Sequence, residues 1–210
     1  MASVLYLVAS PRGARSHSVA VADAFIAAYR QCHPGDSVKT VDLFRADLVP
    51  FDGLAVQAKY AILHGREHTP EELAAWRAVE AVIAEFKAAD KYVLAVPMWN
   101  FGIPYRLKQY IDILLQPGYT FSYDPARGYA GLVVGKRAFV AYARGGQYAP
   151  GTPAEAFDLQ KRYLELVLAF IGLTDVQSVI VEPTLAGGPE EAAARQARAI
   201  ARAREIAASF

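Results

Sequence analysis

Serine residues are concentrated in a short segment that follows the first apolar run of the chain. Ser10 comes directly after the run 4–9, and Ser16 and Ser18 precede an apolar stretch with helical spacing. The N-terminus of a helix has unpaired N–H groups and a positive dipole, so hydroxyls placed there favour a bound anion. Two interpretations stay open on these residues alone: a site for one phosphate monoester, or a serine that only caps the helix.

A second segment, residues 97–104, combines large apolar side chains with one amide. Met98, Trp99 and Phe101 surround Asn100, and proline and glycine residues interrupt the run. These interruptions favour a loop over a buried core segment. A flat aromatic ligand requires an apolar wall and a few oriented polar groups. The segment therefore indicates one wall of a site for a planar ligand.

A third segment, residues 143–146 with the sequence Ala-Arg-Gly-Gly, ends another apolar run. Paired glycines allow the backbone to approach a ligand closely, although a simple turn is the plainer interpretation. No Ser-His-Asp, Cys-His or paired-carboxylate arrangement accompanies these segments. This pattern predicts that a bound cofactor carries the chemistry. His64 and His68 are interpreted as loop residues, so we expect no metal site.

Five short apolar runs alternate with helical patterns, and each run is typical of a strand buried on both faces. This alternation predicts a doubly wound α/β fold, a parallel sheet with helices on both faces. In such a sheet ligands bind at the carboxyl ends of the strands, so the three segments should meet at one edge. The expected strands are residues 4–9, 37–43, 91–96, 137–143 and 176–181.

Capping residues and apolar spacing predict the helices between these strands. The clearest start is Thr69, where Pro70 and Glu72 complete a capping box. The side chains that this helix should bury are Leu73, Trp76, Val79, Val82, Ile83 and Phe86. Other helices are expected at about 19–29, 107–114 and 157–171, and from 187–190 onward.

Two connections are expected to lack helices. Residues 44–68 are interpreted as a loop, because Pro50, Gly53 and Gly65 interrupt them. Residues 119–134 alternate poorly and are interpreted as an aromatic, hairpin-like excursion. No internal repeat or linker divides the sequence, so we expect a single domain over residues 1–210.

The composition limits the classes of partner and compartment. Lys plus Arg total 22 and Asp plus Glu total 21, so the net charge is +1. This balance argues against nucleic acid or an anionic membrane as a partner. The single cysteine, Cys32, excludes an internal disulfide and predicts a cytoplasmic location. We find no signal-peptide pattern, and no apolar run reaches the ~20 residues that a membrane span requires.

Taken together, these segments resemble the FMN-dependent NADH-azoreductases. The resemblance runs from the first expected strand to the last expected helix. The segments that carry it are 10–13, 16–18, 97–101, 107–110, 118–123, 131–136, 144–146 and 170–175.

The resemblance implies a flavodoxin-like fold with strand order 2-1-3-4-5, and a homodimer with two flavin sites at its interface. It implies that the FMN phosphate is held by Ser10, Ser16, His17 and Ser18. The residues implied to line the flavin ring are Pro97, Met98, Trp99, Asn100 and Phe101, with Ala143, Arg144, Gly145 and Gly146 at its pyrimidine end. Phe121, reaching the partner's site, and Tyr148 are implied for the substrate pocket.

The chain departs from the family at positions that bear on substrate range. Trp99 stands where members often have Tyr, and Ala143 stands where some have Ser. Tyr148 stands where some have His, and Val167 replaces an aromatic residue of the pocket.

The function implied is an oxidoreductase in which FMN carries the hydride chemistry, with no catalytic residue expected from the protein. NADH or NADPH is the implied donor, NADH being favoured, and quinones and aromatic azo compounds are the acceptors in a ping-pong reaction. Three alternatives remain: a quinone reductase with incidental azo activity, a flavodoxin-like electron carrier, and a flavin-free binding module. The balanced charge disfavours the carrier, because carriers usually dock through an acidic face.

Overall fold

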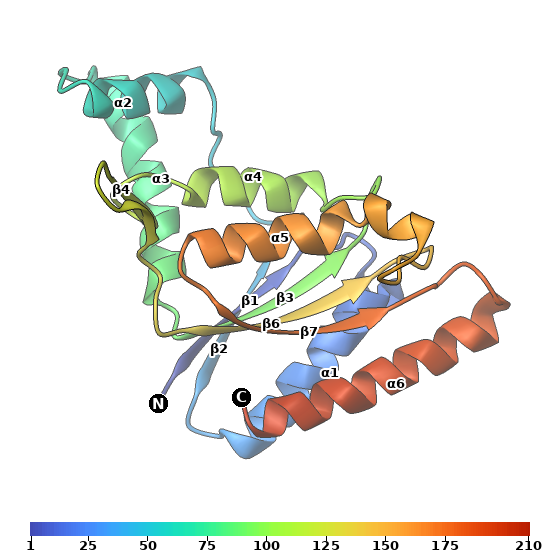
Figure 1. Cartoon of the computed structure of the whole chain (residues 1–210). Helices are drawn as coiled ribbons and strands as arrows, with labels where there is room; N and C mark the ends of the chain where they lie inside the picture. The colour runs from blue at the N-terminus through green and yellow to red at the C-terminus, as the bar shows by residue number, and fades with distance from the viewer.

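A five-stranded parallel sheet forms the centre of the molecule (Figure 1). The structure is a computed structural model that describes residues 1–210. Its strand order is β2-β1-β3-β6-β7. All four strand pairs are parallel, which confirms the expected order 2-1-3-4-5 once the strands of a separate hairpin are left out. The strands are β1 (Ser3–Val8), β2 (Ser37–Asp42), β3 (Lys91–Pro97), β6 (Arg137–Ala143) and β7 (Asp175–Val181).

Helices lie above and below this sheet in Figure 1. On one side are α1 (His17–Cys32) and α6 (Gly188–Ala208), and on the other α3 (Pro70–Ala88), α4 (Tyr105–Leu114) and α5 (Leu159–Phe170). Strand β6 shows why both sides are apolar. Val140 and Tyr142 join one buried cluster, whereas Phe139 and Ala141 join the other. Successive side chains of a strand point to opposite faces, so a strand buried on both faces is apolar throughout.

The capping box predicted at the start of α3 is present. Thr69 Oγ1 accepts a hydrogen bond from the N–H of Glu72, and the Glu72 carboxylate accepts one from the N–H of Thr69. Trp76 and the other expected apolar residues are buried or half-buried, with one exception. The prediction for Leu73 was wrong, because the first turn of α3 extends past the sheet and leaves this side chain 37% exposed.

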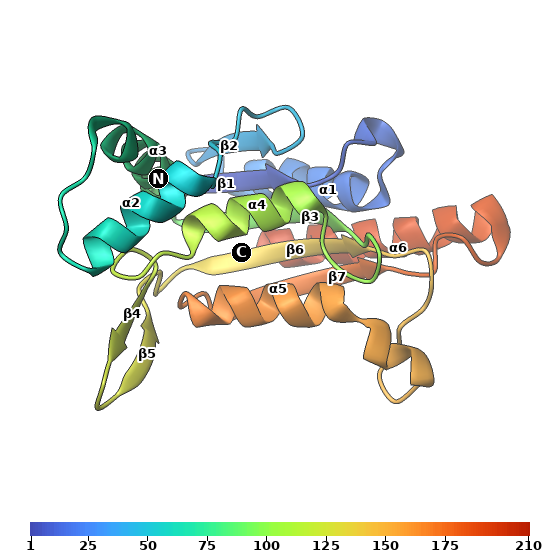
Figure 2. The same cartoon turned by 90° about the horizontal axis from the view of Figure 1, so that it is seen from above.

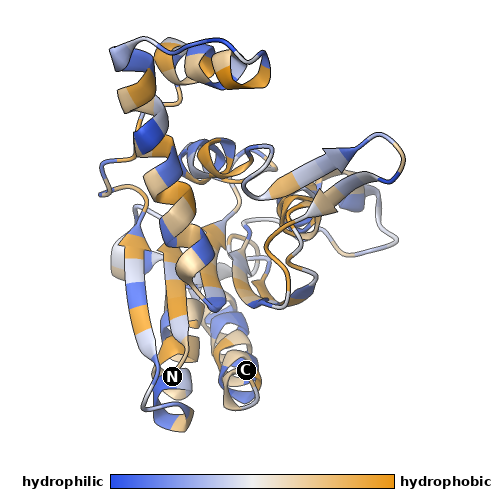
Figure 3. Ribbon diagram, turned by 90° about the vertical axis from the view of Figure 1, so that its left-hand side faces the viewer, coloured by the Kyte–Doolittle hydropathy of each residue, from blue (hydrophilic) through white to orange (hydrophobic).

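The loop predicted between β2 and α3 was also wrong, because it contains helix α2 (Gly53–Leu63). Asp52 caps this helix by accepting hydrogen bonds from the first N–H groups. Ala55, Ala58 and Ala61 are buried. They recur every three residues, so they lie on one helix face. Figure 3 shows α2 lying across the upper end of α3. Small side chains allow this close packing. A search for regularly spaced large apolar residues does not detect such a helix.

The predicted excursion after α4 is a hairpin of β4 (Phe121–Asp124) and β5 (Gly128–Gly131), paired antiparallel. It projects from the end of the molecule opposite the carboxyl ends of the strands (Figure 2). Gly131 is required at its base, because a Cβ there would lie 2.2 Å from the backbone nitrogen of Gly172.

The chain also contains two short 3-10 helices, η1 (Gly13–Arg15) and η2 (Pro153–Phe157). The expected helix at 157–171 is therefore interrupted at its start. Phe157 belongs to η2, and Asp158 caps α5 by accepting a hydrogen bond from the N–H of Lys161. No helix combines the length and the hydropathy needed to cross a bilayer.

Candidate functional site

The three segments singled out in the sequence meet at the carboxyl edge of the sheet. Strand register places Val8 beside Ala95 and Pro97 beside Ala143. The backbone pairing continues past the strands, because the N–H of Met98 donates to the carbonyl of Ala143 at 2.8 Å. The loops after β1, β3 and β6 therefore begin side by side, as the sequence predicted.

The serine loop brings three buried hydroxyls to the N-terminus of α1. Ser10, Ser16 and Ser18 are at most 3% exposed. The Oγ atoms of Ser16 and Ser18 lie 3.1 Å apart, and Ser16 also caps α1 weakly through the N–H of Val19. Ser10 Oγ is buried and has no hydrogen-bond partner in the protein. Buried hydroxyls normally have partners, so a polar group from a ligand fits this position.

His17 approaches this loop through its backbone rather than its ring. Its Nδ1 atom is hydrogen-bonded to the side-chain oxygen of Gln196 on α6. The N–H groups of His17 and Ser18 are in the first turn of α1, where a helix offers no intrahelical acceptor. These N–H groups and the three hydroxyls form a donor set suited to a phosphate monoester.

The loop after β3 is a tight turn held in an unusual backbone conformation. Trp99 and Gly102 exchange backbone hydrogen bonds of 3.0 and 2.9 Å. Between them, Asn100 and Phe101 have φ angles of 48° and 68°. Two left-handed residues define a type I′ turn, whose second position strongly prefers glycine. A phenylalanine there is strained, and such strain is concentrated at functional sites.

The strained turn places Phe101 at the rim of an aromatic group. Phe101 is 45% exposed. Its ring lies 5.2 Å from Phe157 and 6.5 Å, edge-on, from Tyr148. On the other side of the turn, Trp99 lies 5.5 Å from Phe44 and 6.2 Å from Tyr105. The arrangement offers apolar walls to a planar ligand at the sheet edge.

Arg144 could border the flavin ring, as the resemblance implies, only through its backbone. Its side chain is 1% exposed and points into the fold. It donates to Asp158 at 2.7 Å, Gln160 at 3.0 Å and Glu182 at 3.2 Å. Gln160 in turn donates to the carbonyl of Val96 at the end of β3. Arg144 therefore borders the edge through its backbone only, while its guanidinium ties together the ends of β3, β6 and β7.

The glycines that follow Arg144 lie close to two neighbouring side chains. A Cβ on Gly145 would lie 2.7 Å from the Leu185 side chain, and one on Gly146 would lie 3.1 Å from the Tyr148 hydroxyl. Glu182 accepts a hydrogen bond from the N–H of Tyr148 at 3.3 Å and so links this loop to the Arg144 network. The segment therefore packs against Leu185 and Tyr148 and is linked to the buried ion network. Ala143, before Arg144, is buried.

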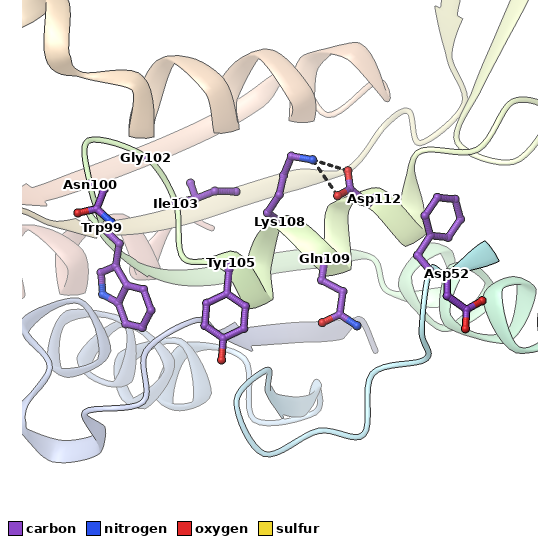
Figure 4. Close-up of a pocket in the computed structure, with 10 residues that line it drawn as sticks. Asp52, Trp99, Asn100, Gly102, Ile103, Tyr105, Lys108, Gln109 and Asp112 are labelled. Atoms are coloured by element: carbon purple, nitrogen blue, oxygen red, sulfur yellow. Dashed lines mark hydrogen bonds and ion pairs between the residues drawn. The ribbon is translucent and has the colours of Figure 1, made fainter. Parts of the chain in front are cut away.

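A cavity of about 710 Å³ opens beside the strained turn (Figure 4). Trp99, Asn100 and Tyr105 line one end, and Lys108, Asp112 and Asp52 line the other. Lys108 Nζ contacts both carboxylate oxygens of Asp112, at 2.6 and 2.8 Å. This hydrogen bond raises the pKa of Lys108, so the ion pair is maintained at neutral pH. Sequence reasoning missed the Lys108, Asp112 and Asp52 end of this cavity, because no sequence pattern connects α4 and the start of α2 with the turn after β3.

Phe121 and Val167 lie away from the turn after β3 in their own chain, and the implied reach of Phe121 into a partner's site stays a prediction. Phe121 is on the hairpin, away from the carboxyl edge, where its ring contacts Phe170 at 4.8 Å. Val167 is buried in the core between α5 and the sheet and lines no part of the cavity. Tyr148, by contrast, lies at the edge beside Gly146 and Phe101.

Comparisons with known proteins agree with this fold. The flavodoxin-like fold family matches residues 2–207. A protein from Nitratidesulfovibrio vulgaris (strain DP4), named FMN-dependent NADH:quinone oxidoreductase, is 58% identical over 210 residues, covering 100% of both chains. An azoreductase structure from Bacillus anthracis str. Sterne superposes with a TM-score of 0.91 at 32% identity, covering 100% of both chains. An FMN-dependent NADH-azoreductase from Bacillus anthracis str. Ames Ancestor, solved in complex with FMN, superposes with a TM-score of 0.89 at 27% identity, covering 100% of this chain and 99% of that one.

Proposed function

Because this chain belongs to the flavodoxin-like fold family, among the FMN-dependent NADH:quinone oxidoreductases, we propose that it is an FMN-dependent reductase that uses NADH. The reaction with a quinone is NADH + H⁺ + quinone → NAD⁺ + hydroquinone. Cleavage of an azo bond to two amines consumes two NADH and two H⁺. The bound FMN supplies the two-electron step between donor and acceptor.

The observation that carries this proposal is the buried, unpartnered hydroxyl of Ser10 beside the start of α1. Together with Ser16, Ser18 and the first N–H groups of α1, it forms a set of donors for the phosphate of FMN. Trp99 and Phe101 would bracket the flat ring at the adjacent loop. The backbone of residues 143–146 would border its other end, where N–H groups favour developing negative charge.

The cavity beside the turn supports a shared site for donor and acceptor. If nicotinamide and acceptor use the same space in turn, the kinetics are ping-pong. Initial rates with varied NADH and a quinone should then give parallel double-reciprocal lines. Intersecting lines would reject the shared site. A protein whose bound flavin stays oxidised when mixed anaerobically with NADH would instead support the electron-carrier alternative.

Quinones are favoured over azo compounds as the main acceptors by one observation. The relative at 58% identity is named a quinone oxidoreductase, whereas the azoreductase structures are 27–34% identical. We expect kcat/KM for a naphthoquinone to exceed that for an azo dye, and the reverse ranking would overturn this choice. The lone, exposed Cys32 agrees with a cytoplasmic enzyme.

We further propose a homodimer formed through the face between α4 and α5. A groove of about 810 Å³ lies there, and the α5 residues Leu159 and Leu166 are 53% and 68% exposed. Large exposed apolar residues around a groove are typical of an interface. Gly102, Ile103 and Lys108 line both this groove and the cavity beside the turn. A second copy seated on the groove would therefore border the flavin site.

Replacing Leu166 with Glu tests the dimer. We expect the Leu166→Glu variant to be monomeric by light scattering, because a charge would be buried in an apolar interface, while the natural protein is dimeric. Glu205→Gln, on the far side of the sheet, is the control and should stay dimeric. A natural protein that scatters as a monomer would contradict the proposed interface.

A further inference from the structure

A fourth loop begins at the carboxyl edge of the sheet, in addition to the three that the sequence singled out. Residues 182–187 connect β7 to α6 (Figure 1). Strand register places Val181, the last residue of β7, beside Ala143. The N–H of Arg144 then donates to the carbonyl of Val181 at 3.0 Å. The loop therefore starts next to the segment that we propose to border the flavin ring.

Hydrogen bonds hold this loop from two sides. Thr184 donates to the carbonyl of Arg144 from its N–H at 2.9 Å and from its hydroxyl at 3.0 Å. From α6, the guanidinium of Arg195 donates to the carbonyls of Pro183 and Ala186, at 3.1 and 3.0 Å. All of these contacts lie within one chain, so they do not depend on a second copy. They keep the side chains of the loop in place.

Leu185 is the side chain that this loop presents at the edge. It is 83% exposed, more than any other large apolar residue except Met1. Its N–H donates to the carbonyl of Gly145 at 3.2 Å, and its Cδ1 atom lies 2.7 Å from the position that a Cβ on Gly145 would take. Single exposed leucines are common. This one, however, lies against the backbone at the edge of the proposed site.

The N–H groups of Gly145 and Gly146 are available to a ligand at the same point. Neither donates to a backbone carbonyl, although both residues are half-buried. The Glu182 carboxylate accepts a hydrogen bond from the N–H of Tyr148 instead. Backbone N–H groups in the interior normally have an acceptor. The pyrimidine end of a flavin carries carbonyl oxygens and a ring nitrogen that would serve as acceptors here.

An apolar side chain beside two free N–H groups suits the end of a flat, polar-edged ring. We infer that Leu185 is a binding residue for the flavin ring, which covers its pyrimidine end and excludes water from the hydrogen bonds donated by Gly145 and Gly146. The inference rests on the proposed function and adds a residue to that site. Exclusion of water strengthens these hydrogen bonds. Because the loop is already held in place, little conformational entropy is lost when the ring binds.

Leu185→Ala tests this role through the binding of FMN and of riboflavin, measured by fluorescence titration of the flavin-free protein. Both affinities should fall about fivefold to tenfold, because the two compounds share the ring and lose the same apolar contact. The ratio of the two affinities should stay as in the natural protein. The free energy of unfolding of the flavin-free variant should also be unchanged, since the side chain is exposed. A residue that only stabilised the fold would change this free energy.

Two further variants serve as controls. Leu185→Met keeps an apolar side chain of similar volume, and its flavin affinities should stay within about twofold of the natural values. Leu63→Ala makes the same truncation at a leucine that is 52% exposed, on helix α2, which lies away from the loop 182–187 in Figure 1. Its affinities should equal those of the natural protein. No loss in Leu185→Ala, or an equal loss in Leu63→Ala, would overturn the inference.

Anaerobic mixing with NADH separates this inference from the reductase function. If Leu185→Ala weakens flavin binding as expected but NADH does not reduce the bound flavin of the natural protein, Leu185 keeps its role and the reductase is rejected. If NADH reduces the flavin and Leu185→Ala binds both compounds normally, the reductase stands and the inference is rejected. A natural protein that binds neither FMN nor riboflavin would reject both.

Discussion

Arg144→Met is expected to lower the free energy of unfolding by about 3–5 kcal/mol. The guanidinium is 1% exposed, and its partners Asp158 and Glu182 are 11% and 18% exposed. Methionine would leave two largely buried carboxylates without their cation. The measurement is equilibrium denaturation by urea, with the slope checked against the natural protein.

Two further variants make this prediction specific. Lys39→Met breaks an exposed pair with Glu85, at 2.8 Å, and should cost less than about 1 kcal/mol. Asp158→Asn added to Arg144→Met should recover part of the loss, because one unpaired charge is removed. If Arg144→Met costs no more than Lys39→Met, the network does not hold the strand ends together.

The same variant should also weaken FMN binding. The carbonyl of Arg144 accepts hydrogen bonds from the N–H and the hydroxyl of Thr184, and Glu182 holds the N–H of Tyr148. Loss of the guanidinium releases Glu182 and therefore the loop that carries Gly145 and Gly146. The buried ion network therefore holds the loop at the proposed flavin site in place and also stabilises the fold.

Ser10→Ala is expected to have opposite effects on binding and on stability. The affinity for FMN should fall about 10- to 100-fold, which corresponds to one hydrogen bond to a charged phosphate. Without FMN, the free energy of unfolding should stay the same or rise slightly, because this buried hydroxyl has no partner in the protein. Fluorescence titration with FMN and urea denaturation give the two values.

Ser122→Ala on the hairpin is the matched control, because Ser122 is half-buried and distant from the serine loop. Its affinity for FMN should equal that of the natural protein. If Ser10→Ala binds FMN as tightly as the control does, the phosphate is held elsewhere.

The strand order was predictable because the central strands are buried on both faces. Val4–Val8 and residues 137–143 contain almost no polar side chains, and helical patterns alternate with them. That combination leaves few arrangements besides a parallel sheet. The capping box at Thr69 was equally clear, since it depends on residues three apart in the chain.

Helix α2 escaped prediction because its signals are weak and local breakers surround it. Pro50 and Gly53 favour a loop, while the helix is held by the Asp52 cap and by small residues such as Ala58. Packing of alanines against another helix depends on tertiary structure, which overrides local preference.

The site was predictable in its outline but not in its internal connections. The loops after β1, β3 and β6 could be assigned to one edge because parallel strands end there. The partners of Arg144 lie 14, 16 and 38 residues away in sequence, and no spacing rule connects them. The strain at Phe101 was also hidden, because a φ of 68° at a phenylalanine contradicts its normal preference.

The central claim is that the serine loop and the aromatic turn hold one phosphate and one flat ring together. Parallel titrations of the flavin-free protein with FMN and with riboflavin, which lacks the phosphate, test it most directly. Several charge-assisted hydrogen bonds at Ser10, Ser16 and Ser18 should make FMN bind at least about 100-fold more tightly than riboflavin. Equal affinity for the two compounds, or no binding of FMN, would contradict the claim.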